Sequence, residues 1–177
     1  MWEDHTRDVV YYASRYADAL LKDRPELHEA LVLAARSHDL GKQRAVWQRS
    51  IGNDDYPRHV YAKSGRLPDG SALRPGKLNA NYRHEFGSII DSPDMPDIVL
   101  HLIAAHHGRG RPHFPADEAF DQDAKEEDTE RLAAEVPRRF ARLQRKYGRW
   151  GLAYLESLLR AADYAASAGP SQTGEQL

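Results

Sequence analysis

The sequence predicts an all-α protein that forms a single compact domain. Apolar residues recur at helical spacing over most of the chain, and no segment shows a convincing strand pattern. The length of 177 residues suits one domain that can bury about two-thirds of its unfolded surface without disulfides. We expect this domain to span residues 1–168 and to be followed by a disordered polar tail over 169–177.

The N-terminal part of the chain is expected to form three helices. Apolar side chains at helical spacing predict the first helix over about 5–22. Pro25 suits the first turn of a second helix, and Gly41 offers a natural stop or bend at its end. A short helix is expected to follow over about 46–51.

The remainder of the chain begins with a segment of different character. Glycine and proline recur over about 52–82, which predicts a long irregular loop of the kind that often carries function. Helical patterning then returns at about 83–91, 97–107, 127–147 and 149–167. Pro137 should kink or split the third of these helices, because proline removes a backbone donor.

Composition excludes several kinds of protein. The absence of cysteine excludes a disulfide framework, thiolate zinc sites, iron–sulfur ligation and cysteine nucleophiles. The formal net charge of −2 gives no global basic field. No run approaches the ~20 apolar residues of a membrane helix, and the N-terminus shows no signal sequence. We therefore expect a cytoplasmic protein with no membrane partner.

The informative feature is the placement of histidine and aspartate. Five histidines and two aspartates lie at expected helix ends or within apolar helical segments: His5, His38, Asp39, His84, His106, His107 and Asp163. Buried polar side chains cost stability unless they are paired or bind metal. Imidazole and carboxylate ligands favour transition metals over Mg²⁺ or Ca²⁺, and seven ligands exceed the needs of one tetrahedral zinc. Two divalent ions, with Mn, Fe, Co or Ni favoured over Mg, are therefore predicted.

Each part of this pattern also has a plainer interpretation. One His-Asp pair occurs by chance in many proteins, and the His106–His107 pair could cap a helix. Asp163 alone could make a polar contact between helices. The remaining histidines have no supporting context, and we interpret them as structural or solvent-exposed: His28, His59, His101 and His113.

The order of the seven residues on a helical chain resembles the HD superfamily of metal-dependent phosphohydrolases. More specifically, the chain looks like the HD nuclease domain of type I CRISPR helicase-nucleases, with some similarity to subtype I-G or I-U. The runs that carry this resemblance are His38-Asp39-Leu40-Gly41-Lys42, Arg83-His84-Glu85-Phe86-Gly87-Ser88, Ala105-His106-His107-Gly108 and Gly108-Arg109-Gly110-Arg111-Pro112-His113-Phe114. The resemblance implies an HD-type helical domain.

The resemblance also implies roles for individual residues. The first metal would take His5, His38, Asp39 and Asp163, and the second would take Asp39 as a bridge with His84, His106 and His107. Lys42 would act beside Asp39 in catalysis by contacting the scissile phosphate, and Ser167 would contact DNA.

The implied function is metal-dependent hydrolysis of phosphodiester bonds in single-stranded DNA during CRISPR interference. The implied partners are a helicase domain or subunit and a CRISPR surveillance complex. Two adjacent cations would lower the pKa of a water molecule and offset phosphate charge. Two alternatives stay open: a phosphohydrolase acting on nucleotides or cyclic nucleotides, and a non-catalytic metal-stabilised docking module.

Positive and negative charges are concentrated in different segments of the chain, which the net charge of −2 does not show. The segment 58–83 holds six cationic residues and one anionic residue, whereas 116–130 holds eight acids and one lysine. The first segment could hold phosphates, although an ordinary solvated loop is an equal alternative. The candidate DNA-binding cations are Lys63, Arg66, Arg74 and Lys77, joined by Arg109 and Arg111 beside the histidine pair.

Overall fold

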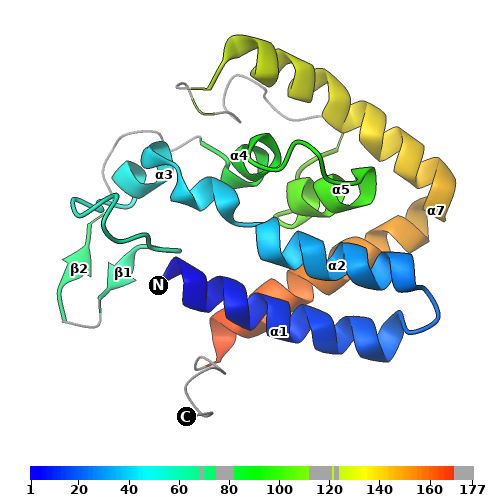
Figure 1. Cartoon of the computed structure of the whole chain (residues 1–177), viewed down its shortest axis with the longest axis horizontal. Coiled ribbons are helices and arrows are strands. Elements are labelled where there is room, and N and C mark those ends of the chain that lie inside the picture. Colours follow the sequence, from blue (N-terminus) through cyan, green and yellow to red (C-terminus); the bar gives the residue numbers. More distant parts are fainter. Residues whose placement is uncertain (68–69, 75–81, 112–120, 122–123, 170–177) are drawn as a thin grey trace.

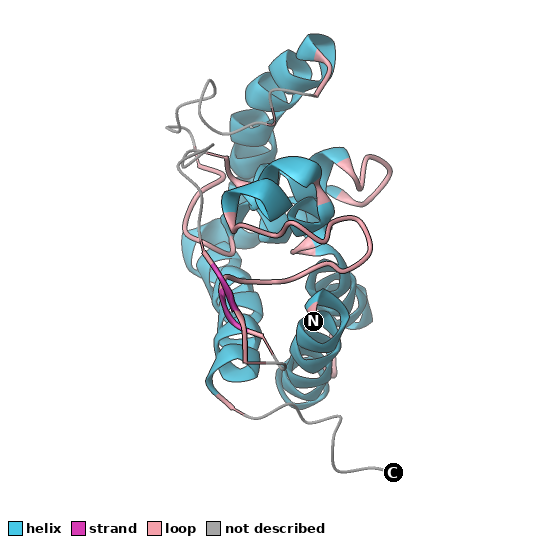
Figure 2. Ribbon diagram, turned by 90° about the vertical axis from the view of Figure 1, so that its left-hand side faces the viewer, coloured by secondary structure: helices cyan, strands magenta, loops and turns pink. Residues whose placement is uncertain are grey.

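The protein is a bundle of α-helices with one short strand pair on its outside (Figures 1 and 2). The computed structural model describes residues 1–67, 70–74, 82–111, 121 and 124–169. In chain order the described elements are α1 (Trp2–Leu20), α2 (Pro25–Ser37), the 3₁₀-helix η1 (Leu40–Gln43), α3 (Ala45–Ser50), β1 (Gly65–Arg66), β2 (Ala72–Leu73), α4 (His84–Ile90), α5 (Asp97–Ala105) and α7 (Glu126–Ala168). The predicted all-α class of a compact helical domain is confirmed.

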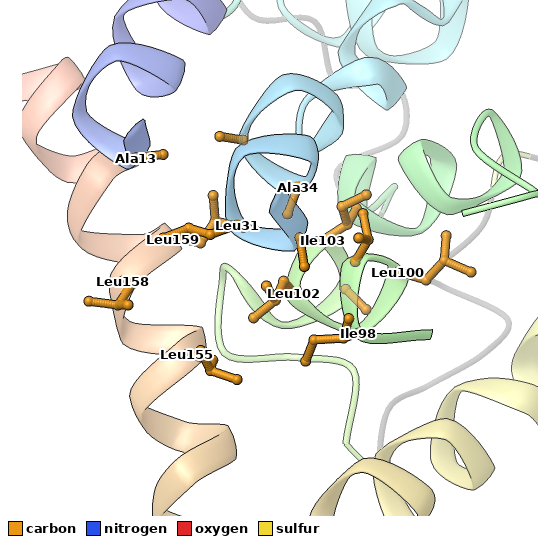
Figure 3. Packing of buried hydrophobic residues seen from close by; sticks show 14 of the residues in the cluster. Ala13, Leu31, Ala34, Ile98, Leu100, Leu102, Ile103, Leu155, Leu158 and Leu159 are labelled. Carbon is orange, nitrogen blue, oxygen red and sulfur yellow. The ribbon is translucent and has the colours of Figure 1, made fainter. Parts of the chain in front are cut away.

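Helix α5 lies at the centre of the bundle and packs against α2, α4 and α7. Every residue from Ile98 to Ala105 is buried, as expected for a helix that is apolar on all sides. Helices α1 and α2 form an antiparallel pair, which the C-terminal part of α7 crosses (Figure 1). Leu31, Ile103 and Leu159 are fully buried in the core that these helices share (Figure 3).

The turn after α2 is held against α4 by backbone packing. Helix α2 ends at Ser37, before Gly41, so Gly41 does not stop this helix and lies inside η1 instead. A Cβ at Gly41 would lie 2.8 Å from the backbone nitrogen of Ser88 and would also collide with the carbonyl of His84. Glycine is therefore needed here for close approach between η1 and α4, not for a helix end.

The expected irregular loop contains a little regular structure. Among the described residues of 52–82, β1 and β2 pair antiparallel with Gly65 opposite Leu73, a two-residue ladder that sequence patterning did not predict. Buried Gln48 holds the loop in place. Its amide nitrogen donates to the carbonyls of Lys42, at 2.6 Å, and Tyr61, at 3.0 Å. Its side-chain oxygen accepts the Tyr61 amide at 3.2 Å, so one side chain ties the loop to η1.

Helix α7 breaks at the boundary expected between the last two helices. Its 43 residues run from Glu126 to Ala168, and Gly148 leaves helical geometry with φ of 73°. The prediction that Pro137 splits the helix is wrong, because Pro137 lies inside α7 with helical backbone angles. Val136 beside it is 1% exposed, so core packing holds this turn in helical form.

Several expectations fall on residues that the structure does not describe. Lys77, His113 and positions 170–177 of the expected tail lie outside the described residues. Among the helices that are described, none is both long and apolar enough to cross a membrane.

Candidate metal centre

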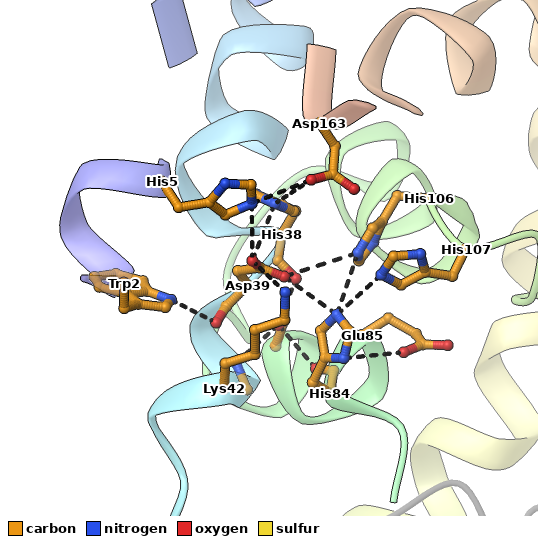
Figure 4. A network of polar contacts seen from close by, with 12 residues as sticks. Trp2, His5, His38, Asp39, Lys42, His84, Glu85, His106, His107 and Asp163 are labelled. Atoms are coloured by element: carbon orange, nitrogen blue, oxygen red, sulfur yellow. Dashed lines mark hydrogen bonds and ion pairs between the residues drawn. The ribbon is translucent and has the colours of Figure 1, made fainter. Parts of the chain in front are cut away.

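Seven side chains from five separate parts of the chain meet at one end of the bundle (Figure 4). The turn after α2 brings His38 and Asp39, α4 begins with His84, and the end of α5 brings His106 and His107. His5 comes from the first turns of α1 and Asp163 from the last turns of α7. These are the seven residues that the sequence predicted as metal ligands.

The carboxylate of Asp39 lies at the centre of this group and is 1% exposed. Its Oδ2 accepts from Lys42 Nζ at 2.7 Å and lies 3.6 Å from His5 Nε2. Its Oδ1 lies 3.1 Å from His84 Nε2 and 3.9 Å from His106 Nε2. Each oxygen of Asp39 therefore faces a different set of histidines.

The donor atoms are close enough to share cations. Three groups each place their ligand atoms within 4.8 Å of one another: His84 with His106 and His107, His5 with His38 and Asp39, and His38 with His106 and Asp163. Imidazole nitrogen and carboxylate oxygen together suit first-row transition metals better than an all-oxygen set would. These buried groups could hold a metal ion.

Two of the histidines are oriented by the ends of their own helices. His38 Nδ1 lies 2.8 Å from the carbonyl of Ala35, and His106 Nδ1 lies 2.6 Å from the carbonyl of Ile103. A carbonyl can only accept, so Nδ1 is the donor in both rings. In the neutral ring the Nε2 lone pair is then directed into the site, which is the arrangement that metal-ligating histidines show.

Unsatisfied atoms in the site have the chemistry of a cation site. Asp39 Oδ1 and His38 Nε2 are buried and make no hydrogen bond of regular geometry among the described residues, although Oδ1 lies 3.1 Å from His84 Nε2 and His38 Nε2 lies 3.4 Å from Asp39 Oδ2. His84 Nε2 lies 3.4 Å from His106 Nε2 and 3.2 Å from His107 Nε2, so ring nitrogens face one another. Buried groups of this kind are costly unless something satisfies them. A divalent cation fits, because it would satisfy lone pairs on several of these atoms at once.

Burial and charge act differently on the pKa values of the site. Burial lowers the pKa of His84 and His107, and it lowers that of His106 well below the ordinary value, with neighbouring histidines adding to the effect. Burial opposes ionisation of Asp39, but His38 and Lys42 outweigh it and hold the pKa of this carboxyl well below its usual range. Three histidines are thus kept neutral beside an ionised carboxylate, which are the protonation states that bind metal.

Burial also lowers the pKa of His38, but Asp39 outweighs it, with a smaller contribution from Asp163, so the net pKa is raised. The pKa of Asp163 is lowered, because a hydrogen bond with His5 and the charge of His38 outweigh its burial. His5 Nε2 lies 3.1 Å from Asp163 Oδ1, which joins the first and last helices across the site.

Supporting residues escaped the sequence analysis. The Trp2 indole donates to the Asp39 carbonyl at 2.9 Å, and the Trp47 ring packs edge-on against His84 with centroids 5.0 Å apart. The Ser88 hydroxyl accepts the Gly41 amide at 2.8 Å and lies 2.7 Å from the His38 carbonyl. Ser88 closes the matched run 83–88, which was the one signal that could have found it.

A cavity of about 690 Å³ opens over the cluster. Lys63 and Ser167, two of the predicted DNA-binding residues, line it and are exposed. Side chains of the site also line it, among them His5, Lys42, His107 and Asp163. A cation on the loop and a hydroxyl on α7 therefore flank the mouth of the candidate metal centre.

The other predicted DNA-binding cations lie elsewhere or are not described. Arg74 and Arg109 are exposed and do not line the cavity. Arg111 pairs with Glu156 and lies over the Phe140 ring at 5.9 Å, in a separate groove. The side chain of Arg66 is outside the described part of the structure.

The remaining histidines that the structure describes have ordinary partners. His101 is buried and lies 2.8 Å from Glu156, and His28 lies 2.8 Å from Asp18. His59 pairs with Asp55.

Comparisons with protein families, curated proteins and solved structures find no match to this chain.

Proposed function

We propose that this protein is a metal-dependent nuclease that hydrolyses phosphodiester bonds of single-stranded DNA. The observation that carries the proposal is the convergence of seven ligands around buried Asp39 Oδ1 and His38 Nε2, neither of which makes a hydrogen bond of regular geometry among the described residues. A structural polar cluster would satisfy such atoms internally, whereas a metal-dependent hydrolase needs them for cations. The resemblance of the motifs to HD nucleases selects the reaction.

The ligands divide into two proposed metal positions. His5, His38 and Asp163 would hold one ion, and His84, His106 and His107 would hold the other, with Asp39 as a ligand of both. This division agrees with the two faces of Asp39, because Oδ2 lies near His5 and His38 whereas Oδ1 lies near His84 and His106. Mn, Fe, Co or Ni is favoured over Mg by the number of imidazoles.

Bound divalent ions would supply a water of lowered pKa and would offset the charge of the phosphodiester. The chain would contribute a further cation, Lys42, which is 9% exposed and lines the cavity. Its Nζ lies 2.7 Å from Asp39 Oδ2. Beside a metal-bound Asp39, the Lys42 ammonium would stabilise the negative charge that develops on the phosphate.

The cavity is proposed to receive the DNA strand. Lys63 would contact a phosphate at its mouth, and Ser167 would donate a hydrogen bond to a neighbouring phosphate. A helicase domain or subunit, working with a CRISPR surveillance complex, would deliver the unpaired strand to this opening.

The size of the cavity favours one alternative. A volume of about 690 Å³ is also within the range of small-ligand sites, so a nucleotide or cyclic nucleotide is a second candidate substrate. The third candidate is a metal-stabilised docking module without turnover.

The test compares end-labelled single-stranded DNA with deoxynucleoside triphosphates and cyclic nucleotides as substrates. We expect cleavage of DNA that stops with chelator and returns with Mn²⁺, Ni²⁺ or Co²⁺. Asp39→Ala should abolish cleavage, whereas Asp18→Ala, at an exposed carboxylate that pairs with His28, should not. Circular dichroism and metal analysis of each variant separate loss of ligand from loss of fold.

Each other result assigns a different function. Faster turnover of nucleotides than of DNA would select the phosphohydrolase. Stoichiometric metal with no turnover of any phosphoester would select the docking module. Full activity of Asp39→Ala would refute the metal mechanism altogether.

A further inference from the structure

A second cationic surface lies on α7, in residues that the metal centre does not use. The segment 136–149 carries six cationic residues and no anionic one, in a chain whose net charge is −2. The N-terminal turns of the same helix are acidic, with Glu126, Glu127 and Asp128 in the first turn. Six of the eight cationic residues of α7 therefore lie in this segment around the break at Gly148.

Helical spacing gathers four of these cations on one face, whereas Arg139 is buried and pairs with Asp97. Arg138, Arg142 and Arg145 recur at i, i+4 and i+7, and Lys146 follows Arg142 by four residues. All four side chains are exposed, and Arg149 is exposed just past the break. From Arg138 to Arg145 the face extends about 10 Å at 1.5 Å per residue, which is enough for two successive phosphates of an extended strand.

The surface is not neutralised by the rest of the protein. Among the described residues, Arg138, Arg145, Lys146 and Arg149 have no ion pair, whereas Arg142 pairs with Asp97 and Glu135. Like charges at this spacing repel one another, so the arrangement is unfavourable for the free helix. An anionic ligand would relieve that repulsion.

An exposed aromatic side chain lies just past the break at Gly148. Trp150 is 89% exposed, which is more than any other large hydrophobic side chain in the described structure. With Arg149 and Phe140 it lines a groove of about 380 Å³. Glu156 also lines this groove, but its carboxylate already pairs with His101 and Arg111. An exposed indole beside the unpaired Arg149 is the combination that an unpaired base and its phosphate require.

We propose that this α7 basic surface (Arg138, Arg145, Lys146, Arg149 and Trp150) binds single-stranded nucleic acid, with the cations on phosphates and Trp150 stacked on a base. It shares no residue with the cavity over the metal centre and so provides a second contact with the strand. The inference rests on the proposed function for its choice of an unpaired strand. An acidic protein surface would satisfy the cations but would leave the indole without a stacking partner.

The test uses the full chain, with chelator present so that the strand is not cut. Binding of a fluorescent oligodeoxythymidylate of about 20 nucleotides is followed by anisotropy between about 50 and 200 mM KCl. The variant replaces Arg138, Arg145 and Arg149 by Gln. A control of equal charge change replaces Lys22, Arg24 and Arg36 by Gln; these exposed cations lie before and within α2.

The triple variant on α7 should reduce the slope of log K against log salt by about 2, since each phosphate contact to a single strand contributes ~0.7. At 0.1 M salt this corresponds to roughly 100-fold weaker binding. The control variant should keep the wild-type slope. Trp150→Ala should weaken binding roughly tenfold without changing the slope, and Trp150→Phe should restore most of the loss.

Two outcomes would overturn the inference. One is a wild-type salt slope in the α7 triple variant when circular dichroism shows an intact fold. The other is an acidic polypeptide that binds as tightly as the oligonucleotide and depends equally on Trp150. Failure of the proposed function is distinguishable, because it appears as absent cleavage by the metal-loaded wild type while binding to the α7 basic surface persists.

Discussion

Replacing Gly41 by alanine should disrupt the candidate metal centre through backbone packing alone. Gly41 lies in η1, where its amide donates to Ser88 Oγ at 2.8 Å and its carbonyl accepts the Tyr82 hydroxyl at 3.0 Å. An added Cβ would lie 2.8 Å from Ser88 N and 2.9 Å from the carbonyl carbon of His84, and would collide with the carbonyl oxygen. These are backbone atoms of α4, which cannot rotate out of the way as a side chain would.

The cost can be worked from two effects. Overpacking of a tight core costs about 1–3 kcal/mol. Separation of η1 from α4 would also leave the buried Gly41 amide without its acceptor, which adds about 1–3 kcal/mol. A total of about 4 kcal/mol is a large part of the ~5–15 kcal/mol that stabilises a typical domain. It corresponds to a fall in Tm of roughly 8–16 °C for a protein of this size.

The assay is thermal and chemical unfolding followed by circular dichroism, together with metal titration. Metal affinity should fall with stability, because the α4 backbone that moves begins at the ligand His84. Gly151→Ala is the matched control. Its Cβ would meet only Tyr147 Cβ, at 3.7 Å, so the helical preference of alanine should raise stability by up to about 1 kcal/mol.

The same change from glycine to alanine should lower stability at Gly41 and raise it at Gly151. An unfolding midpoint for Gly41→Ala equal to that of the wild type, or higher, would show that η1 and α4 have room to separate. Normal metal affinity in a destabilised Gly41→Ala would show that the position of His84 does not depend on this contact.

Three further predictions follow from other parts of the structure. Gln48→Ala should lower the free energy of unfolding by about 2–3 kcal/mol, because it leaves backbone groups of the loop and of η1 without their hydrogen-bond partner. Proteolysis within residues 53–67 should also become faster, because the Gln48 side chain holds this loop. The pKa of Asp97 is lowered, because hydrogen bonds from Arg142 and Arg139 outweigh its burial. The ionised carboxylate therefore stabilises the folded protein above the ordinary pKa of 3.8, and this stabilisation is lost as the pH falls through the lower pKa of the folded state. Asp97→Asn should therefore destabilise the protein by about 1 kcal/mol at pH 7. A difference from the wild type that does not shrink as the pH falls below 3.8 would contradict this. Mn²⁺ at about 100 times its Kd should stabilise the wild type by ~2.7 kcal/mol, and an equal rise in Asp39→Ala would place the ion elsewhere.

The helices were largely predictable because the period of apolar residues reports directly on helix formation. Pro25 begins α2, and the break at Gly148 separates the two parts of α7 as expected. Pro137 was misjudged because local propensity argues against a helix there, whereas packing of the neighbouring Val136 in the core favours one. The two-residue strand pair was missed because a ladder that short has no periodic signal.

The candidate site divides in the same way. Its residue types and order were visible in the sequence, but the supporting contacts were not. Gln48 lies in a short helix, and no sequence pattern distinguishes it from other polar residues. Its structural role arises from the loop backbone at Tyr61, which folds against it and forms hydrogen bonds with its side chain. The helical spacing of the Arg and Lys residues on α7 is likewise visible in the sequence. Only the tertiary structure shows which of these cations have no acidic partner.

By itself, the sequence determined the chemistry available to this protein. With no cysteine, any metal must be held by imidazole and carboxylate, and helix ends are where those residues occur. The tertiary structure decided that these groups meet: His5 and Asp163, which are 158 residues apart in the chain, come within 3.1 Å. That meeting depends on how α1, α2, α5 and α7 pack around a shared core. Periodicity reports which face of a helix is buried, whereas the partner of that face is set by contacts between distant segments.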